Sequence, residues 1–337
     1  MQINLSFFFR KPSPVFHSIE EQFFAVQKEL PEEIKYKNVF AKFHSKGFFK
    51  RLFITIQSAF NQGDINHITG DIHFIALFLK KEKTVLTVHD IGSILNKTGF
   101  KVKILRFFWF TMPFARVKYI TVISEFTKKE ILDNFNVNPG KISVIPDCVS
   151  AKISYSEKTF NTEKPNILQI GTKTNKNIER LIPALSDINC KLTIIGKLSE
   201  NQILLLKKHK IDYENFFNLP FLVLLNLYKK ADLVTFVSTY EGFGVPILEA
   251  QASGRPVITS NISPMKDVAG NGALLVSPNS VEEIKSAVNR LINDSDLRFS
   301  LIKNGLENVK KYSAKSVADQ YYNLYKSVYN ANNPELS

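Results

Sequence analysis

The sequence has 337 residues, a length that corresponds to two domains at roughly 150 residues each. Hydrophobic residues make up 44% and charged residues 22%, as in a globular protein that buries its own core. The two cysteines, Cys148 and Cys190, exclude a disulfide framework and a four-cysteine zinc site, so we expect reduced thiols in a cytosolic compartment.

No segment has the character of a membrane anchor or an export signal. The longest uncharged apolar stretches are His73–Leu79 and Phe107–Ala115, far below the roughly 18 residues that a spanning helix needs. The apolar start of the chain precedes its positive charges, the reverse of a secretory signal. We therefore expect a cytoplasmic protein that does not cross the membrane.

The formal net charge is +13, which favours an anionic partner: nucleic acid, an anionic membrane surface or a phosphorylated substrate. The positive charge is spread over both halves of the chain, and no nucleic-acid recognition motif is present. We therefore expect no nucleic-acid partner.

The first half of the chain alternates short apolar runs with segments of helical spacing. Helices are predicted at Ser18–Leu30 and Glu125–Phe135. Alternation of this kind indicates a parallel sheet covered on both faces. The predicted strands are Ile3–Phe9, Ile34–Phe40, Ile65–Thr69, Thr84–His89, Tyr119–Ile123 and Ile142–Ile145.

A polar segment at 151–165 interrupts this pattern, and we interpret it as a linker between domains at 1–150 and 166–312. Helices are predicted at Ser280–Asn293, Ser295–Tyr312 and Ala314–Tyr329. The last helix belongs to the C-terminal segment 313–337, which we expect to pack back on the first domain. The predicted strands of the second half are Asn166–Ile170, Lys191–Ile195, Phe216–Leu219, Leu233–Val237, Pro256–Thr259 and Ala273–Val276.

The sequence thus predicts two doubly wound α/β domains, which bind ligands at the carboxyl ends of their strands. With two such domains, we expect the site in the cleft between them.

The segment from Ser238 to Ile262 carries the clearest chemical signal. A strand ends there in a turn with Gly242 and Gly244, which lets the backbone come close to a ligand. Pro246 suits the first turn of the helix that follows. A glycine turn before a helix N-terminus is typical of a phosphate-binding site.

Glu241 and Glu249 lie eight residues apart, one in the turn and one inside the helix. Carboxylates do not bind phosphate, but they accept hydrogen bonds from sugar hydroxyls. The alternative is a pair of solvated charges at a helix end.

The pattern Glu-Gly-Phe-Gly-x-Pro-x-x-Glu-Ala, with Gly-x-Pro-Val-Ile following, resembles the E-x7-E signature of retaining glycosyltransferases of family 4. These enzymes have the GT-B architecture, in which an N-terminal domain binds the acceptor and a C-terminal domain binds the sugar nucleotide. The resemblance also covers Ile170–Ile178, Leu227–Ala231 and Ala269–Val276, and more weakly Leu86–Asp90, Val122–Thr127 and Ile142–Pro146.

The resemblance implies a role for both carboxylates. Glu249 would hold the nucleotide ribose, and Glu241 would contact the donor sugar near the reacting carbon. The backbone of Phe243, Gly244 and Val245 would bind the donor beside Glu241.

The resemblance further implies that Lys176 neutralises the leaving diphosphate and that His89 lies beside the transferred sugar. Gly171 and Lys173 belong to the same donor-binding turn as Lys176. Two alternatives stay open: Lys176 as an ordinary surface lysine, and His89 as a structural histidine bonded to backbone.

Two departures from the family pattern concern the phosphate contacts. Many relatives carry an arginine beside the phosphate lysine, where this chain offers Lys173 as a point charge without bidentate geometry. The first strand also lacks a Gly-Gly pair, and a positive turn of Arg10 and Lys11 could serve in its place.

His67, Asp71 and His73 invite interpretation as a metal site, but no second cluster supports one, so we expect none. We expect no permanently bound cofactor either. The donor would be a GDP- or UDP-sugar, and the loops expected to read the base, Gly196–Leu198 and Asn218–Phe221, carry no decodable motif.

Phe40–Phe60 and Lys101–Tyr119 combine lysine and arginine with many aromatic residues. Such stretches are typical of amphipathic helices that lie on anionic membranes. The alternative is a set of core aromatics with a solvated basic face, and both stay open.

The resemblance implies a metal-independent, retaining hexosyltransferase that uses a nucleoside diphosphate sugar. Its acceptor would be a hydroxyl of a glycan or a lipid-linked molecule in bacterial surface polysaccharide synthesis, such as lipopolysaccharide. The basic aromatic stretches add the hypothesis of peripheral contact with an anionic membrane at the inner face of the cell membrane, where a lipid-linked acceptor is reached. The alternatives are a sugar-nucleotide epimerase of the same architecture and a catalytically silent sugar-nucleotide or glycan-binding protein. Intact Glu241, Glu249 and Lys176 argue against the silent protein.

Overall fold

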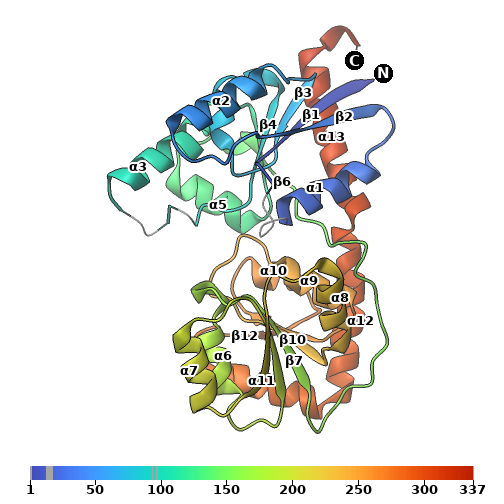
Figure 1. Ribbon diagram of the computed structural model, residues 1–337. Coiled ribbons are helices and arrows are strands. Elements are labelled where there is room, and N and C mark those ends of the chain that lie inside the picture. Colours follow the sequence, from blue (N-terminus) through green and yellow to red (C-terminus); the bar gives the residue numbers. More distant parts are fainter. Residues whose placement is uncertain (1, 13–17, 93, 96–97, 337) are drawn as a thin grey trace. The chain divides into compact units, whose positions relative to one another are not determined.

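The computed structural model describes residues 2–12, 18–92, 94–95 and 98–336, and the chain forms two compact units. Unit 1 comprises residues 1–148 and 314–337, and unit 2 comprises 149–313. Each unit contains one six-stranded, fully parallel sheet with helices on both faces (Figure 1). The prediction of two doubly wound α/β folds is therefore confirmed.

Unit 1 has the strand order β2-β1-β3-β4-β5-β6. The predicted strands are confirmed, and four of them end one residue earlier than expected. The strands are β1 (Ile3–Phe9), β2 (Ile34–Phe40), β3 (Ile65–Ile68), β4 (Thr84–Val88), β5 (Tyr119–Val122) and β6 (Ile142–Val144). The helices are α1 (Ser18–Glu29), α2 (Phe48–Ala59), α3 (Phe100–Arg106), α4 (Met112–Arg116), α5 (Glu125–Asn134) and α13 (Ala314–Asn332), with a π-helical turn at Phe107–Thr111 between α3 and α4.

The side chains of β1 alternate between two cores because successive residues of a strand point to opposite faces. Phe8 packs in the core that includes Ile54 of α2. Phe7 and Phe9 pack on the other face, with α1 and α13. Helix α13 is thus part of the core of unit 1, although nearly 170 residues of sequence separate it from β6.

A buried hydrogen-bonded chain fixes α13 on the sheet. The His67 ring lies 2.7 Å from the Tyr325 hydroxyl through Nδ1 and 2.7 Å from Thr87 Oγ1 through Nε2. Burial lowers the pKa of His67 to about 3, so the ring is neutral at physiological pH. Because both ring nitrogens are bonded in a fully buried position, the chain ties α13 to β3 and β4 in one register.

Unit 2 has the strand order β12-β11-β10-β7-β8-β9. In chain order this is the 3-2-1-4-5-6 arrangement of dinucleotide-binding folds, and it reverses direction between β7 and β10. The strands are β7 (Asn166–Ile170), β8 (Lys191–Ile195), β9 (Asp212–Phe216), β10 (Leu233–Phe236), β11 (Val257–Ser260) and β12 (Leu274–Val276). The helices are α6 (Ile178–Ala184), α7 (Glu200–Lys208), α8 (Phe221–Lys230), α9 (Val245–Ala252), α10 (Met265–Ala269), α11 (Val281–Asn293) and α12 (Ser295–Asn308).

The predicted strand Phe216–Leu219 is wrong: the strand is β9, Asp212–Phe216. This strand pairs only with β8 at the edge of the sheet, where polar side chains face water at little cost. The more apolar residues after it turn away, since Asn218 has a φ of 52°, outside the extended range. The apolar pattern therefore predicted this strand a few residues later in the chain than it occurs.

The polar segment 151–165 belongs to unit 2 and packs along it. Arg255 donates a 2.7 Å hydrogen bond to Ser156 Oγ, and Lys158 forms a 2.8 Å ion pair with Asp232. The segment expected as a linker is thus anchored to the second sheet by charged side chains that are themselves largely shielded.

Cys148 and Cys190 are free and buried, in agreement with the expected structural thiols. Burial raises the pKa of both thiols, to about 12 for Cys148 and about 11 for Cys190, so neither is a reactive thiolate. Within the described ranges, no helix is long and apolar enough to cross a membrane.

The Tyr325→Phe substitution removes the hydroxyl that pairs with His67 and leaves a buried ring nitrogen unsatisfied. We expect unit 1 to lose about 1–3 kcal/mol of stability. The single tryptophan, Trp109, lies in unit 1, so its fluorescence during denaturation follows this unit. Tyr329→Phe, one turn further along α13, is the matched control, and equal effects of the two substitutions would contradict the role of the buried chain.

Candidate active site

The switch point of unit 2 brings two charged side chains together. Lys176 follows β7 and Glu241 follows β10, and these two strands are neighbours in the sheet. Lys176 Nζ lies 2.6 Å from Glu241 Oε1, and Asn175 donates a 3.2 Å hydrogen bond to the same oxygen. Residues 65 positions apart thus form one cluster at the sheet edge where this fold class binds ligands.

The environment of this ion pair is largely shielded from water. The side chains of Lys176 and Glu241 are 19% and 15% exposed, and Lys176 Nζ lies 4.5 Å from the centre of the Phe236 ring. The ring face attracts the ammonium group, and partial burial strengthens every charge interaction there. The pair therefore holds a positive and a negative group in fixed positions, ready for a ligand that carries both phosphate and hydroxyl groups.

Gly171 makes room for the lysine chain. Its φ is 91°, a left-handed conformation that glycine adopts without strain. A Cβ atom there would lie 2.6 Å from Lys176 Cγ. The glycine thus lets the aliphatic part of Lys176 cross directly over the end of β7.

The N-terminus of α9 lies in the same loop as Glu241. Gly244 precedes the helix with a φ of 128°, and the amide of Ile247 bonds back to its carbonyl at 2.9 Å. Because Pro246 has no amide hydrogen, Val245 supplies the first-turn amide that the helix itself does not use. This helix start therefore offers an anion fewer free amides than the four of a standard helix N-terminus.

Phe243 turns its side chain into the protein. It is 5% exposed and packs on Tyr312 with ring centres 5.7 Å apart. Its side chain therefore packs inside unit 2 and does not line the loop surface. Lys173, by contrast, is exposed at the start of the turn Thr174–Lys176, and the cluster around Glu241 forms without it.

Glu249 lies within α9 and has a different partner. The Tyr228 hydroxyl of α8 donates a 2.5 Å hydrogen bond to Glu249 Oε2. Burial raises the pKa of Glu249, and the tyrosine hydrogen bond opposes that rise. The carboxylate is thus kept in a shielded position by one strong bond, and we regard Tyr228 as its positioning residue.

In unit 1, His89 follows β4 and is held by backbone. Its Nε2 donates a 2.8 Å hydrogen bond to the Thr69 carbonyl, and its Nδ1 lies 3.8 Å from Asp147 Oδ1. Gly70 fits against the ring, since a Cβ atom there would lie 2.9 Å from His89 Cδ2. The backbone bond of the alternative interpretation, a structural histidine, is therefore present. It turns the second ring nitrogen toward Asp147, a carboxyl group whose pKa is raised by burial.

The residues of the metal interpretation are engaged elsewhere. His67 bonds within the core, His73 bonds the Trp109 carbonyl through Nδ1 at 2.8 Å, and Asp71 pairs with Arg10. Among the described residues, no three or more His, Cys, Asp or Glu side chains gather as metal ligands. The charge of Arg10 is met by Asp71 and by Glu20, so Arg10 is committed to unit 1 itself.

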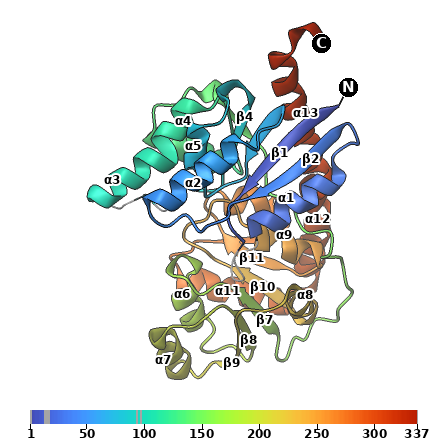
Figure 2. The ribbon, with the colours of Figure 1, turned by 45° about the horizontal axis from the view of Figure 1, so that its top comes forward.

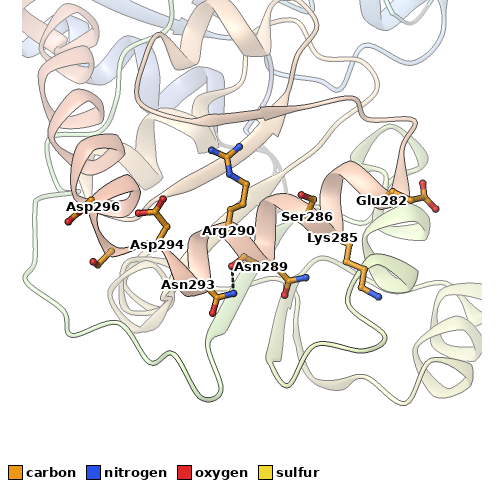
Figure 3. A pocket seen from close by; sticks show the side chains of 9 residues that line it. Glu282, Lys285, Ser286, Asn289, Arg290, Asn293, Asp294 and Asp296 are labelled. Carbon is orange, nitrogen blue, oxygen red and sulfur yellow. Dashed lines mark hydrogen bonds between the residues drawn. The ribbon is translucent and has the colours of Figure 1, made fainter.

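A surface depression lies elsewhere in unit 2, along α11 and the start of α12 (Figure 3). Its side chains are mixed in charge: Lys285 and Arg290 lie between Glu282 at one end and Asp294 and Asp296 at the other. Lys285 is paired with Asp187 at 2.6 Å. Because none of these residues belongs to the loops after β7 and β10, the depression is separate from the Lys176–Glu241 cluster.

Sequence reasoning gave no role to Asn175, Tyr228 or Asp147. Asn175 had a local signal, because it directly precedes Lys176. Tyr228 lies in the segment Leu227–Ala231 that resembles the family, but nothing in the sequence paired it with Glu249, and Asp147 had no signal. Their partners, Glu249 and His89, are 21 and 58 positions away and become neighbours only through the fold.

The architecture matches solved glycosyltransferases. The crystal structure of Anabaena Alr3699/HepE in complex with UDP and glucose has a TM-score of 0.79 at 12% identity, covering 97% of this chain and 100% of that one. WaaG, a glycosyltransferase involved in lipopolysaccharide biosynthesis, has a TM-score of 0.68 at 15% identity over 95% and 99% of the two chains. The two parallel six-stranded sheets therefore define the GT-B class.

Sequence comparison then gives the family. The profile of glycosyl transferases group 1 matches residues 152–308, and that of glycosyltransferase family 4 matches residues 24–152. The chain belongs to the family 4 glycosyltransferases, as its E-x7-E signature predicted.

Individual relatives agree with this family. An uncharacterized glycosyltransferase of Methanocaldococcus jannaschii is 30% identical over 75% of this chain and 72% of its own length. The O-antigen chain mannosyltransferase RfbU of Salmonella typhimurium is 32% identical over 64% and 63% of the two chains. The O-antigen chain mannosyltransferase B of Escherichia coli is 26% identical over 73% and 70%.

Gly171→Ala tests how Lys176 is held. Alanine at this φ costs about 1–2 kcal/mol, and its methyl group displaces the lysine chain from Glu241. Gly47→Ala is the matched control, since Gly47 has a φ of 83° but open space around it. We expect similar losses of thermal stability in both variants and a fall in glycosyl transfer of about tenfold only in Gly171→Ala. Equal transfer rates would contradict the proposed support of Lys176.

Tyr228→Phe removes the hydrogen bond that opposes the raised pKa of Glu249, so this pKa rises further. We expect unit 2 to lose about 1.5–3 kcal/mol where Glu249 is ionised, and less at acidic pH where it is protonated. Hydrogen exchange of unit 2 peptides at both pH values measures the loss. In a Glu249→Gln background, the stability loss caused by Tyr228→Phe should no longer depend on pH. If the pH dependence persists, a group other than Glu249 causes it.

Proposed function

We propose that this protein is a retaining, metal-independent hexosyltransferase that takes its sugar from a nucleoside diphosphate sugar. The observation that carries the proposal is the Lys176–Glu241 pair at the switch point of unit 2, beside the N-terminus of α9. This one cluster offers a cation for phosphate and a carboxylate for sugar hydroxyls, which are the two chemical parts of a sugar nucleotide.

The leaving diphosphate is the species that most needs stabilising. As the bond from the anomeric carbon to the phosphate oxygen breaks, negative charge grows on that oxygen. In the proposed reaction Lys176 and the Val245 amide meet this charge, and the partial burial of the Lys176 side chain supports this role. Since two protein groups supply the positive charge, the proposed reaction needs no metal ion.

The proposed transfer occurs on one face of the sugar. The acceptor hydroxyl attacks the anomeric carbon from the side that the diphosphate leaves, a new carbon–oxygen bond forms, and the hydroxyl proton passes to a phosphate oxygen. The configuration of the anomeric carbon is thereby retained. Glu241 orients the sugar hydroxyls, Glu249 binds the nucleotide ribose, and His89 of unit 1 contacts the transferred sugar.

The substrate class follows from the relatives. Two of them are named O-antigen chain mannosyltransferases, which favours a mannosyl donor and an acceptor in bacterial surface polysaccharide synthesis. We propose a glycan or lipid-linked acceptor reached from the cytoplasm. GDP and UDP are both compatible with the site, because the loops after β8 and β9 carry no base-specific motif.

Nucleotide binding gives the first test. At a hundred times its dissociation constant, the correct nucleotide should stabilise the protein by about 2.7 kcal/mol, visible as a higher unfolding temperature with either UDP or GDP. Lys176→Ala should remove most of this shift and lower the transfer rate by about 100-fold or more. Glu214→Gln is the matched control, because it breaks the exposed Lys191–Glu214 pair at the edge of the same sheet.

Product analysis separates the alternatives. We expect NMR of the purified product to show the same anomeric configuration as the donor, and EDTA to leave the rate unchanged. An inverted product would overturn the retaining mechanism. Donor isomerised without acceptor would identify an epimerase, and tight binding without turnover on any acceptor would identify a silent binding protein.

A further inference from the structure

Helix α2 presents its apolar side to the outside. Phe48 and Phe49 are 71% and 83% exposed, and Phe60 directly after the helix is 86% exposed. The side that packs on unit 1 contains Thr55 and Ser58, whose hydroxyls bond to the helix's own carbonyls. In a helix whose outer side meets only water, the polar side chains lie on that side and the apolar side chains face the protein.

A second segment repeats this arrangement. Phe100 of α3 is 77% exposed, and Phe107 and Phe108 of the π-helical turn are about half exposed. Arg51 of α2 stacks 4.6 Å from the centre of the Trp109 ring, which joins the two segments. Figure 2 shows α2 and α3 on the same side of unit 1.

We name this surface the aromatic face. It comprises the exposed side chains of Phe43, Phe48, Phe49, Leu52, Phe53, Ile56, Phe60, Phe100, Ile104, Phe107 and Phe108. These are more than half of the large apolar side chains exposed among the described residues, whereas those of unit 2 are scattered over several elements. Contiguous exposed apolar surface of this kind marks an interaction site.

The charged side chains within the two segments that form the aromatic face have a single sign. Lys42, Lys46 and Lys50 flank the first segment, and Lys101 and Lys103 flank the second, all exposed. Neither 41–63 nor 98–124 contains an aspartate or a glutamate. The partner of this face therefore carries negative charge and offers an apolar layer.

We propose that the aromatic face docks on an anionic membrane surface, with the phenylalanine side chains among the acyl chains and the lysines at the lipid phosphates. A second copy of this chain would bring equal positive charges together, which disfavours self-association through the same face. Anionic lipid satisfies both requirements at once. This inference rests on the proposed function in one respect: docking would bring the enzyme to a lipid-linked acceptor.

Vesicle sedimentation tests the docking. The probes are phosphatidylcholine vesicles and phosphatidylcholine–phosphatidylglycerol vesicles, at low salt and at about 0.15 M salt. We expect binding only to the anionic vesicles, weakened by salt. Phe48→Ser/Phe49→Ser and Lys46→Gln/Lys50→Gln should each lower the affinity about tenfold or more.

The matched controls are Phe299→Ser and Lys303→Gln on α12 of unit 2, where Phe299 is 71% exposed. Both should bind vesicles like the unsubstituted protein. All variants should keep the nucleotide-induced rise in unfolding temperature, so that loss of docking and loss of donor binding are measured separately.

Three results would overturn the proposal. The first is no sedimentation with anionic vesicles at low salt, even though the nucleotide shift is present. The second is equal loss of binding in the α2 variants and in the α12 controls. The third is a dimer in sedimentation velocity that dissociates in Phe48→Ser/Phe49→Ser, which would assign the aromatic face to a second copy.

Discussion

The reversal of strand order between β7 and β10 is the constraint on which the active site depends. Two crossover connections run in opposite directions from this point, so the loops after both strands open at the same edge without a helix between them. Lys176 and Glu241 meet there because each follows one of these strands within a few residues. A strand order in which β7 and β10 were not neighbours would separate the two charges.

The site keeps charged groups in shielded positions, which is costly unless each has a partner. Lys176 has Glu241 and the Phe236 ring, and Glu249 has the Tyr228 hydroxyl. A sugar nucleotide can replace such partners by its own phosphate and hydroxyl groups. Each charged side chain of the cluster is thus held by a partner within unit 2.

Much of this could be predicted from the sequence, for reasons that lie in particular residues. The central strands were found because both of their faces are buried and their apolar runs are continuous. The edge strand β9 was misplaced because its polar residues follow no such rule. Glu241, Glu249 and Lys176 were predicted through the resemblance to the family motifs, but the partnership of Glu249 with Tyr228 joins two helices and leaves no periodic signal.

Helix α2 shows a deeper limit of pattern analysis. Helical spacing of phenylalanine indicates an apolar stripe, but it does not say whether the stripe faces the core or a partner. For α2 the answer comes from Ile54, Thr55 and Ser58, which fill the narrow contact with unit 1 and leave the bulky rings outside. For the second basic stretch the answer is divided, since Phe110 and Phe114 lie in the core while Phe107 and Phe108 do not. Core packing and solvent exposure therefore occur within one amphipathic segment, and only the position of each ring relative to the sheet separates the two.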